Sequence, residues 1–342
     1  MNNEKKKSKK ILSIVAVVLV AGILFSLILV DYVSSKNYTE KTSFAMATIS
    51  TYKIWGKNSD KAIQDIIDSV NSAEKNNLSK YSKDSEIFKL NSDSEAQFSD
   101  LSVSWLKSVL DISEKSEGAF DPTIGALTDA WGIGTESAKL PDEQEIKTLL
   151  SAVDYSKIRI NKNTVTIGKN QNIDLGAVGK GIACDIAKTT LRKYDCKEAV
   201  IAFGGSILLY GDKSFDVGIR NPLGDSDDIL GIVSLSDGFV STSGNYERTS
   251  VIEGKTYHHI LDTKTGYPSD SDLLSVTVFC DNGLLSDALS TACYVLGKDK
   301  GFELLEKYNA YGVFVDKEQN IYLSDELKEN FRLKDSSFKV AE

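Results

Sequence analysis

The sequence predicts an α+β protein with a large mixed or antiparallel β-sheet flanked by helices and preceded by one N-terminal transmembrane helix. After residue 44, segments with strand-like alternation and segments with helical spacing follow one another without a regular strand–helix–strand order. Hydrophobic residues make up 41% of the 342 residues, enough for a sizeable core. One run of 20 residues without charge, 11–30, lies near the N-terminus and is long enough to cross a bilayer.

The N-terminal residues divide into three segments of different composition. Residues 1–10 carry five lysines, residues 11–30 are almost wholly apolar, and residues 31–43 are polar. Lysines before the apolar run and Asp31 after it predict that the N-terminus is cytoplasmic and that the rest of the chain is outside. We therefore expect a single-pass anchor in the cell membrane, a tether, and an extracytoplasmic domain over residues 44–335. A cleaved signal peptide is the alternative interpretation of the apolar run.

The first half of the domain is expected to combine one strand, several helices and a hairpin, each recognised by the period of its apolar residues or by its turn residues. The expected elements are a strand at 45–55, helices at 60–70, 101–113 and 141–153, a polar loop with a short helix at 78–91, a bent buried loop at 118–134, and a hairpin of 157–160 with 164–167.

The second half is expected to be richer in strands. Residues 173–191 predict the end of a strand, a glycine-rich turn and a helix, and Gly204 and Gly205 predict a second turn. The other expected elements are strands at 199–203, 215–220, 229–235, 239–243, 249–252, 256–261, 274–280, 311–315 and 321–323, helices at 284–296 and 299–308, and a short final helix.

Charge and cysteine content argue against two classes of protein. The formal net charge is −9, and no basic stripe occurs outside the N-terminus, which argues against a nucleic-acid-binding surface. The four cysteines are scattered without a CxxC pair, so they predict neither a disulfide framework nor a zinc site. Each has apolar neighbours, and we expect small core residues.

The segment IDLGAVGKGIACDIAKTTL, residues 173–191, has the order strand, glycines, lysine, helix. That order presents backbone N–H groups and a positive charge to phosphate. It matches neither the P-loop nor the dinucleotide-binding glycine pattern. A tight turn whose glycines only permit close packing is an equally good interpretation of this segment by itself.

The region from Tyr257 to Gly297 contains the only two histidines of the chain, His258 and His259, and the pair Asp287 and Thr291. Residues four apart on a helix lie on one face, one turn apart. A carboxylate and a hydroxyl in that arrangement offer two oxygen ligands to a hard cation such as Mg²⁺. The alternative is that Ser286 or Asp287 caps the helix, and both roles can coexist.

Six polar, glycine-bearing motifs in this order resemble those of the ApbE family of flavin transferases: GAFDPTIG, IDLGAVGKG, FGGS, TSGNYER, HHILDTKTGYP and SDALST. The resemblance covers residues 44–325. It implies an enzyme that uses FAD, with Mg²⁺, to attach FMN to a threonine of an acceptor protein. The acceptor would be an electron-transfer protein on the outer side of the membrane.

The resemblance also implies roles for particular residues. Asp287 and Thr291 would hold Mg²⁺ together with the backbone carbonyl of Ala177. His259 would lie next to the reacting phosphate, either as a base or as an orienting hydrogen-bond donor, and Asp262 is a second candidate base. Lys180 would compensate charge, unless it forms only a surface ion pair. FAD contacts would come from Met46, Tyr81, Ala119, Phe120, Asp121, Asp174, Lys180 and the backbone of Leu261.

The sequence departs from the family pattern at four positions, none of them an expected metal ligand. Ala202 stands where the family often has Asn, and Ser206 stands where it often has an acidic residue or Asn. Asn245 stands where Asp is common, and Ala47 replaces a frequent glycine. Two other activities stay open at this point. One is hydrolysis of FAD to FMN and AMP at the same metal site, and the other is non-catalytic FAD binding.

Overall fold

The structure is a computed structural model, and it describes residues 38–341. The expected cytoplasmic segment 1–10, the anchor 11–30 and the start of the tether, 31–37, lie outside the described residues. Among residues 38–341, no helix has both the length and the apolar character needed to span a bilayer.

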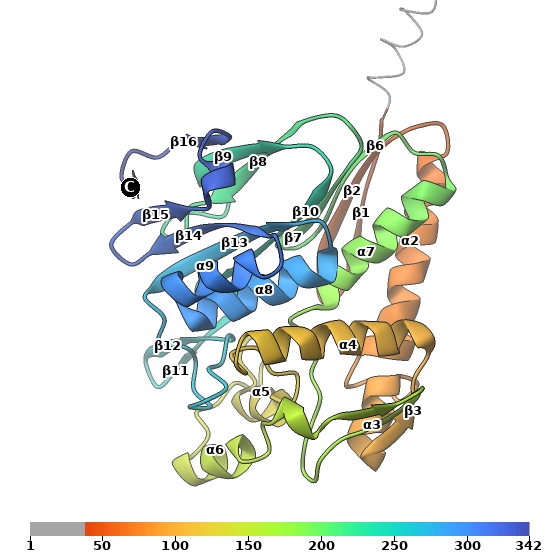
Figure 1. The fold of residues 1–342 in the computed structure, drawn as a ribbon, viewed down its shortest axis with the longest axis vertical. Helices are drawn as coiled ribbons and strands as arrows, with labels where there is room; N and C mark the ends of the chain where they lie inside the picture. The colour runs from red at the N-terminus through yellow and green to blue at the C-terminus, as the bar shows by residue number, and fades with distance from the viewer. Residues whose placement is uncertain (1–37, 342) are drawn as a thin grey trace, which may run out of the picture.

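The centre of the fold is a nine-stranded sheet with the order β1-β2-β6-β7-β10-β13-β14-β15-β17 (Figure 1). Neighbouring strands are antiparallel except β15 and β17, which are parallel, so the expected mixed sheet is confirmed. The strands are β1 (Tyr38–Ala45), β2 (Thr48–Trp55), β6 (Glu198–Phe203), β7 (Ser206–Tyr210), β10 (Gly238–Gly244), β13 (Leu273–Cys280), β14 (Tyr311–Asp316), β15 (Asn320–Leu323) and β17 (Lys339–Val340).

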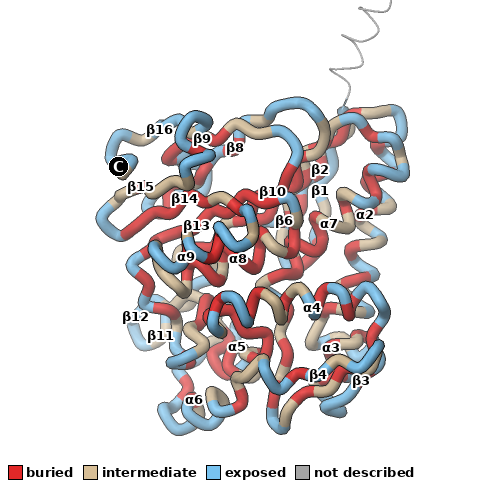
Figure 2. Tube along the Cα trace, in the orientation of Figure 1, coloured by how far each residue is buried: buried red, intermediate tan, exposed pale blue. Residues whose placement is uncertain are grey.

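Helices cover one face of this sheet, and a smaller sheet covers part of the other. The helices are α2 (Ser59–Ala73), α7 (Gly179–Lys193), α8 (Gly283–Leu296) and α9 (Lys298–Glu306). The small sheet consists of β8 (Phe215–Arg220), β9 (Ile229–Leu235) and β16 (Phe331–Leu333). Its apolar side chains, such as Val217 and Val233, form a second core cluster with Val240 and Val313 of the large sheet. The deepest burial therefore lies along the large sheet and α8 (Figure 2).

A second group of elements lies below the sheet and its helices in Figure 1. It contains α3 (Glu86–Asp93), α4 (Asp100–Lys115), α5 (Gly125–Trp131), α6 (Glu143–Leu150) and the small sheet of β3 (Glu95–Gln97), β5 (Thr164–Thr166) and β4 (Arg159–Asn161). The hairpin of β11 (Thr249–Ile252) and β12 (Lys255–His258) lies beside it. Single-turn helices occur at Glu74–Leu78, Tyr155–Lys157 and Asp325–Leu327.

Several expected elements differ from the structure. Residues 38–43, expected as part of a tether, belong to β1 and pair with β2 over its whole length, so that part of the tether is wrong. The bent loop 118–134 contains the helix α5, and the segment before the glycine turn at 176 makes only an isolated bridge between Ile124 and Asn172. The chain does not end in a short helix, because β16 and β17 follow it and extend the fold beyond residue 335.

Candidate active site

The candidate site is organised by the crossing of α7 and α8. Gly181 and Gly283 face each other there, and a Cβ on Gly181 would lie 2.1 Å from the carbonyl oxygen of Gly283. Only glycine permits that approach. Asp185 of α7 strengthens the crossing, because its carboxylate accepts hydrogen bonds from the backbone N–H groups of Gly283 and Leu284 at 2.8 and 2.9 Å. The crossing therefore fixes α8 against the start of α7.

Asp287 lies at this crossing, and its side chain is only 3% exposed. One carboxylate oxygen, Oδ2, accepts a hydrogen bond from the backbone of Gly181 at 3.0 Å. The other, Oδ1, accepts from Ser206 Oγ at 3.1 Å and lies 3.2 Å from Lys180 Nζ. The negative charge is thus buried, oriented by three donors and matched by one ammonium group.

Asp287 does not cap α8. The cap is Asn282, whose side-chain oxygen accepts from the N–H of Leu285 at 2.9 Å, and α8 begins at Gly283. The capping interpretation is wrong for both Ser286 and Asp287, because the observed cap lies four residues before Ser286 and five before Asp287. Asp287 is therefore available for another purpose.

Thr291 lies one turn further along α8, on the same side as Asp287. Its hydroxyl lies 3.2 Å from Ser243 Oγ and donates to the carbonyl oxygen of Asp287 at 3.4 Å. Ser243 also contacts Ser290, and Ser241 contacts Ser286, both at 2.8 Å, so a polar seam joins α8 to β10. This seam sets the rotation of α8 that brings Asp287 and Thr291 to one face.

Ala177 lies in the turn that leads into α7. In a continuing helix its carbonyl oxygen would accept from the N–H of Gly181. That N–H donates to Asp287 instead, and the first α7 bond runs from Ile182 to Val178. The Ala177 carbonyl is therefore left without this partner, four residues before the Gly181 N–H that contacts Asp287. Gly179 and Lys180 also have backbone N–H groups with no acceptor among residues 38–341.

Asp174 and Tyr81 form a second group, joined through Lys80. Asp174 Oδ2 lies 2.9 Å from Lys80 Nζ, and Oδ1 accepts from the N–H of Gly176 at 2.8 Å. Burial opposes ionisation of Asp174, but Lys80 and these hydrogen bonds outweigh it and lower its pKa. The Tyr81 hydroxyl donates to Asp129 at 3.0 Å, while its ring is exposed.

The expected FAD contacts in the turn 119–121 are mostly enclosed by protein. Ala119 and Phe120 are buried. One oxygen of Asp121 accepts from the N–H and hydroxyl of Thr123 at 2.8 and 2.6 Å, and the other accepts from the N–H of Tyr155 at 2.9 Å. The Asp121 side chain therefore holds its own loop together, and burial raises its pKa.

His259 lies on the segment after β12. Its Nδ1 is 3.1 Å from the carbonyl oxygen of Glu247. A carbonyl can only accept, so Nδ1 carries the proton of the neutral ring and Nε2 keeps a free lone pair. Burial, followed by the charges of Arg248 and Lys180, lowers the pKa of His259 to about 4. The neighbouring His258 turns away, and its Nε2 contacts the carbonyl of Ser269 at 3.1 Å.

The segment after His259 forms a tight turn. Leu261 is buried and makes an isolated bridge with Pro268. Asp262 Oδ1 accepts from the N–H of Lys264 at 2.7 Å, so this carboxylate stabilises the turn. Thr263 donates to the carbonyl of Gly118 at 2.6 Å, which ties the turn to the 119–121 segment.

Met46 lies at the tip of the β1–β2 hairpin, against the start of α7. Its backbone N–H donates to Glu74 at 3.1 Å, and its sulfur would lie 3.6 Å from a Cβ on Gly179. The structure thus brings Met46, Asp174, Ala177, Lys180 and Asp287 around the glycine turn at 174–181.

Sequence reasoning missed three groups at the site. Ser206 orients Asp287, and Lys80 links Asp174 to Tyr81. Glu247 is the third, and its carboxylate would lie 3.3 Å from a Cβ on Gly205. Burial raises the pKa of Glu247, the charge of Lys180 opposes that shift, and the charge of Asp287 adds to it. Its position in the TSGNYER motif was the only signal in the sequence.

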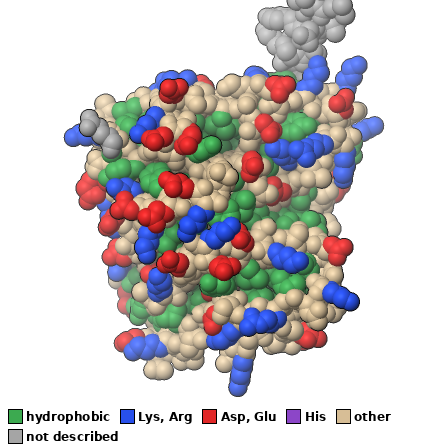
Figure 3. Space-filling view, in the orientation of Figure 1, with side chains coloured by type: hydrophobic (Ala, Val, Ile, Leu, Met, Phe, Trp, Pro, Cys, Tyr) green, Lys and Arg blue, Asp and Glu red, His purple; other side chains and the backbone are tan. Residues whose placement is uncertain are grey.

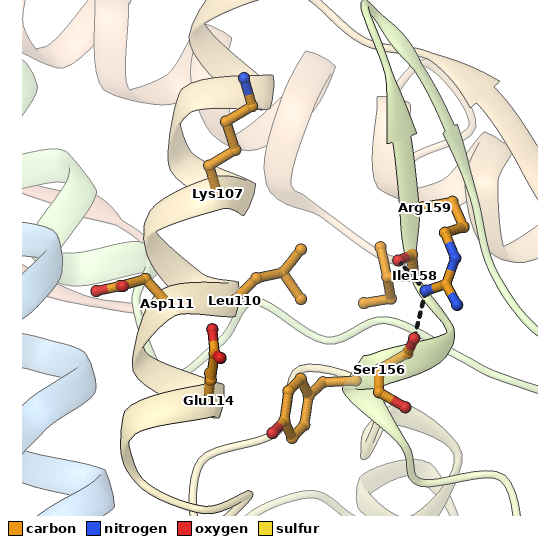
Figure 4. Close-up of a pocket in the computed structure, with 8 residues that line it drawn as sticks. Lys107, Leu110, Asp111, Glu114, Ser156, Ile158 and Arg159 are labelled. Atoms are coloured by element: carbon orange, nitrogen blue, oxygen red, sulfur yellow. Dashed lines mark hydrogen bonds between the residues drawn. The ribbon is translucent and has the colours of Figure 1, made fainter.

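Two surface pockets lie away from this site. One, of about 390 Å³, lies between α4 and the segment around β4 (Figure 4). The charged groups that line it already have partners. Asp111 pairs with Lys115 and Tyr308, and the Arg159 guanidinium donates to backbone carbonyls. The other, of about 380 Å³, lies between α4, α7 and the start of α8. Apolar side chains are visible across the middle of the face shown in Figure 3. Neither pocket is lined by an expected site residue.

Residues 38–341 contain no cluster of three or more His, Cys, Asp or Glu suited to a metal.

Comparison with known proteins gives a consistent result. The sequence model of the ApbE family matches residues 46–315. The FAD:protein FMN transferase of Treponema pallidum is 33% identical over 254 residues, covering 68% of this chain and 70% of the relative. The enzyme of the same name from Klebsiella pneumoniae is 32% identical over 228 residues, covering 66% of this chain and 72% of the relative.

Solved structures give the same fold. The ApbE protein of Thermotoga maritima superimposes with a TM-score of 0.80 at 28% identity, covering 86% of this chain and all of that one. The flavin transferase ApbE of Vibrio cholerae superimposes with a TM-score of 0.77 at 23% identity, covering 86% of this chain and 99% of that one.

Proposed function

The chain belongs to the ApbE family and is a flavin transferase, and from that premise we propose that it moves FMN from FAD to a threonine side chain of an acceptor protein, releasing AMP. The proposal includes Mg²⁺ at Asp287, Thr291 and the carbonyl of Ala177. The observation that carries it is the environment of Asp287, a buried carboxylate aimed at the glycine turn.

The residues present fit a hard divalent cation. All three donors are oxygens, as Mg²⁺ prefers. Asp287 and Thr291 lie on one face of α8, and the Ala177 carbonyl lacks its helical partner. The Lys180 ammonium, 3.2 Å from Asp287, already places one positive charge beside the carboxylate. When bound, the cation offsets the negative charge of the diphosphate.

The start of α7 suits the diphosphate. The backbone N–H groups of Gly179 and Lys180 have no acceptor among the described residues, and no side chain caps this helix. Free N–H groups and the helix dipole attract phosphate oxygens. Lys180 adds a charge at the same place.

The chemistry balances with the groups at hand. The threonine oxygen attacks the phosphorus of the FMN half of FAD, the anhydride P–O bond breaks, and AMP leaves with the bond electrons. The threonine proton needs an acceptor. His259 suits that role, because its Nε2 carries a free lone pair and the ring is neutral above about pH 4. Asp262 suits it less, because its carboxylate already stabilises the 262–266 turn.

We also place this domain on the outer side of the cell membrane, held by residues 11–30, with an extracytoplasmic acceptor. The lysines of residues 1–10 and the apolar run support that orientation. Protease treatment of intact cells should digest the domain, whereas protection of the domain until lysis would contradict the orientation.

The activity is tested by incubating the full-length chain with FAD, Mg²⁺ and a candidate acceptor, followed by intact-mass spectrometry of the acceptor and chromatography of the nucleotides. We expect the acceptor to gain one FMN moiety as AMP appears, and EDTA to stop both. Free FMN with AMP and an unmodified acceptor would indicate hydrolysis. Intact FAD under all conditions would indicate binding alone.

A further inference from the structure

We propose that Lys80 is a positioning residue for FAD, which fixes Asp174 and Tyr81 in the orientation that receives the dinucleotide. The proposal rests on the proposed function, because it assumes that FAD binds beside these two side chains. It concerns a residue for which the motifs of the sequence suggested no role.

Lys80 is a buried cation with an unusual number of partners. Its side chain is 9% exposed. The ammonium group lies 2.7 Å from Asp129 and 2.9 Å from Asp174, and it donates to Thr128 Oγ1 at 2.8 Å and to the carbonyl of Gly125 at 3.3 Å. Burial by itself would lower the pKa of Lys80, but the two carboxylates outweigh it and raise that pKa, so the group stays charged.

The contacts of Lys80 leave Asp174 with little freedom. Oδ2 of Asp174 is used by Lys80 and by Thr128 Oγ1, at 2.9 and 2.8 Å, and Oδ1 accepts from Gly176. Oδ1 lies against the glycine turn, since a Cβ on Gly176 would be 3.0 Å from it. With three donors already bound, two of them at Oδ2, the carboxylate can take one further hydrogen-bond donor at Oδ1.

Lys80 also fixes Tyr81 through Asp129. The Tyr81 hydroxyl and the Lys80 ammonium both contact Oδ1 of Asp129, at 3.0 and 2.7 Å. Tyr81 is nevertheless 73% exposed, so a large aromatic ring faces solvent while its hydroxyl is held. A ring held in this way offers a rigid stacking surface for a planar ligand at little entropic cost.

The geometry thus connects three separate segments through one ammonium group: the 78–81 loop, α5 and the start of the glycine turn. None of these contacts reaches Asp287, Thr291 or His259 in the described structure. Lys80 should therefore affect how well FAD binds and should have little effect on the chemical step.

The test compares Lys80→Met with wild type in steady-state transfer assays and in FAD titrations followed by flavin fluorescence. We expect KM and Kd for FAD to rise about tenfold to a hundredfold, as for loss of a buried ion-pair partner. We expect kcat to change less than about threefold. Lys80→Arg, which keeps the charge, should recover part of the affinity.

Lys188→Met is the matched control. Lys188, on α7, is also largely buried, with 14% of its side chain exposed. Its ammonium group lies 2.7 Å from the Asp237 carboxylate. Its removal should leave KM for FAD unchanged. If Lys80→Met does not fold, Asp129→Ala is the second variant. Asp129 is more exposed than Lys80, and its removal releases the Tyr81 hydroxyl, so KM for FAD should still rise.

An unchanged KM in Lys80→Met, or a loss of kcat at constant KM, would overturn the positioning role. A wild-type protein that neither binds FAD nor transfers FMN would instead overturn the proposed function, and it would do so before any variant is compared.

Discussion

His259 shows how the surroundings of a single residue set its chemistry. Burial and two nearby cations hold its pKa at about 4, well below the usual 6.5, so the ring is neutral at physiological pH. Its Nδ1 is committed to the carbonyl of Glu247, which leaves Nε2 as the only basic atom. The ring is therefore unprotonated and oriented throughout the physiological range, and its low pKa makes it a weaker base than an ordinary histidine.

The lowered pKa of His259 predicts a specific dependence of stability on pH. Between about pH 4 and 6.5 the unfolded state binds a proton at this site that the folded state does not, so stability falls as pH falls through that window. His259→Gln removes the titrating group. The slope of the unfolding free energy against pH should then be shallower, by up to about 1.4 kcal/mol per pH unit.

This slope is measured by urea unfolding of the protein without added FAD or Mg²⁺, at several pH values from 4 to 8. His258→Gln removes the neighbouring imidazole, whose pKa burial also lowers, and so measures how much of the wild-type slope belongs to His258. Equal slopes for wild type and His259→Gln would show that His259 titrates normally and would remove the argument for a neutral ring.

At the residue scale, the expected metal ligands were easier to recognise in the sequence than the residues that orient them. Asp287 and Thr291 were recognisable because they lie four apart in a helical motif. Lys80 was not recognisable, because its partners lie up to 94 positions away, at Asp174, and a single lysine in a polar segment carries no pattern. Ser206 was noticed only as a departure from the family, although it donates directly to Asp287.

At the scale of elements, the close approach of α7 and α8 determines the site. Gly181→Ala would place a Cβ 2.1 Å from the Gly283 carbonyl oxygen and 2.9 Å from Asp287 Cβ. Backbone atoms cannot rotate away, so the helices must separate. We expect a loss of about 1–3 kcal/mol of stability, typical of overpacking, together with a lower transfer rate, because the N–H of Gly181 would no longer reach Asp287.

Gly179→Ala is the matched control, since it lies in the same first turn of α7. Its Cβ would meet only the Met46 sulfur, at 3.6 Å, which is an ordinary contact. Thermal unfolding of both variants should show a clear loss for Gly181→Ala and none for Gly179→Ala. Equal melting temperatures in the two variants would contradict the close crossing.

The elements that sequence reasoning missed share a physical cause. Strand β1 is polar on most of its length, and its turn to β2 consists of Met46 and Ala47, both with positive φ. Such turns normally contain Gly or Asn, so the hairpin gave no turn signal. The turn expected at Gly204 and Gly205 is present and joins β6 to β7 as a two-residue hairpin turn, but the strand that follows it, β7, was missed.

At the scale of the whole molecule, the large sheet and the second group of elements meet at the glycine turn of residues 174–181. Helices α7 and α8 bring Lys180 and the proposed cation ligand Asp287 from the sheet side, while Lys80 and α5 hold the side chains of Asp174 and Tyr81. The α+β class and the mixed sheet followed from periodicity. The meeting of the two groups of elements could not be predicted from periodicity, because it depends on contacts between residues about a hundred positions apart.

The central claim is that Asp287 holds the cation required for FMN transfer, and the most direct measurement is FMN labelling of an acceptor by Asp287→Asn. Asp237→Asn is the control, because it removes a half-exposed carboxylate that pairs with Lys188 of α7 and touches none of the expected cation ligands. Asp287→Asn should fold, with an unchanged circular dichroism spectrum, and should label the acceptor at least about 100-fold more slowly, while Asp237→Asn stays active. Labelling by Asp287→Asn at the wild-type rate would contradict the claim.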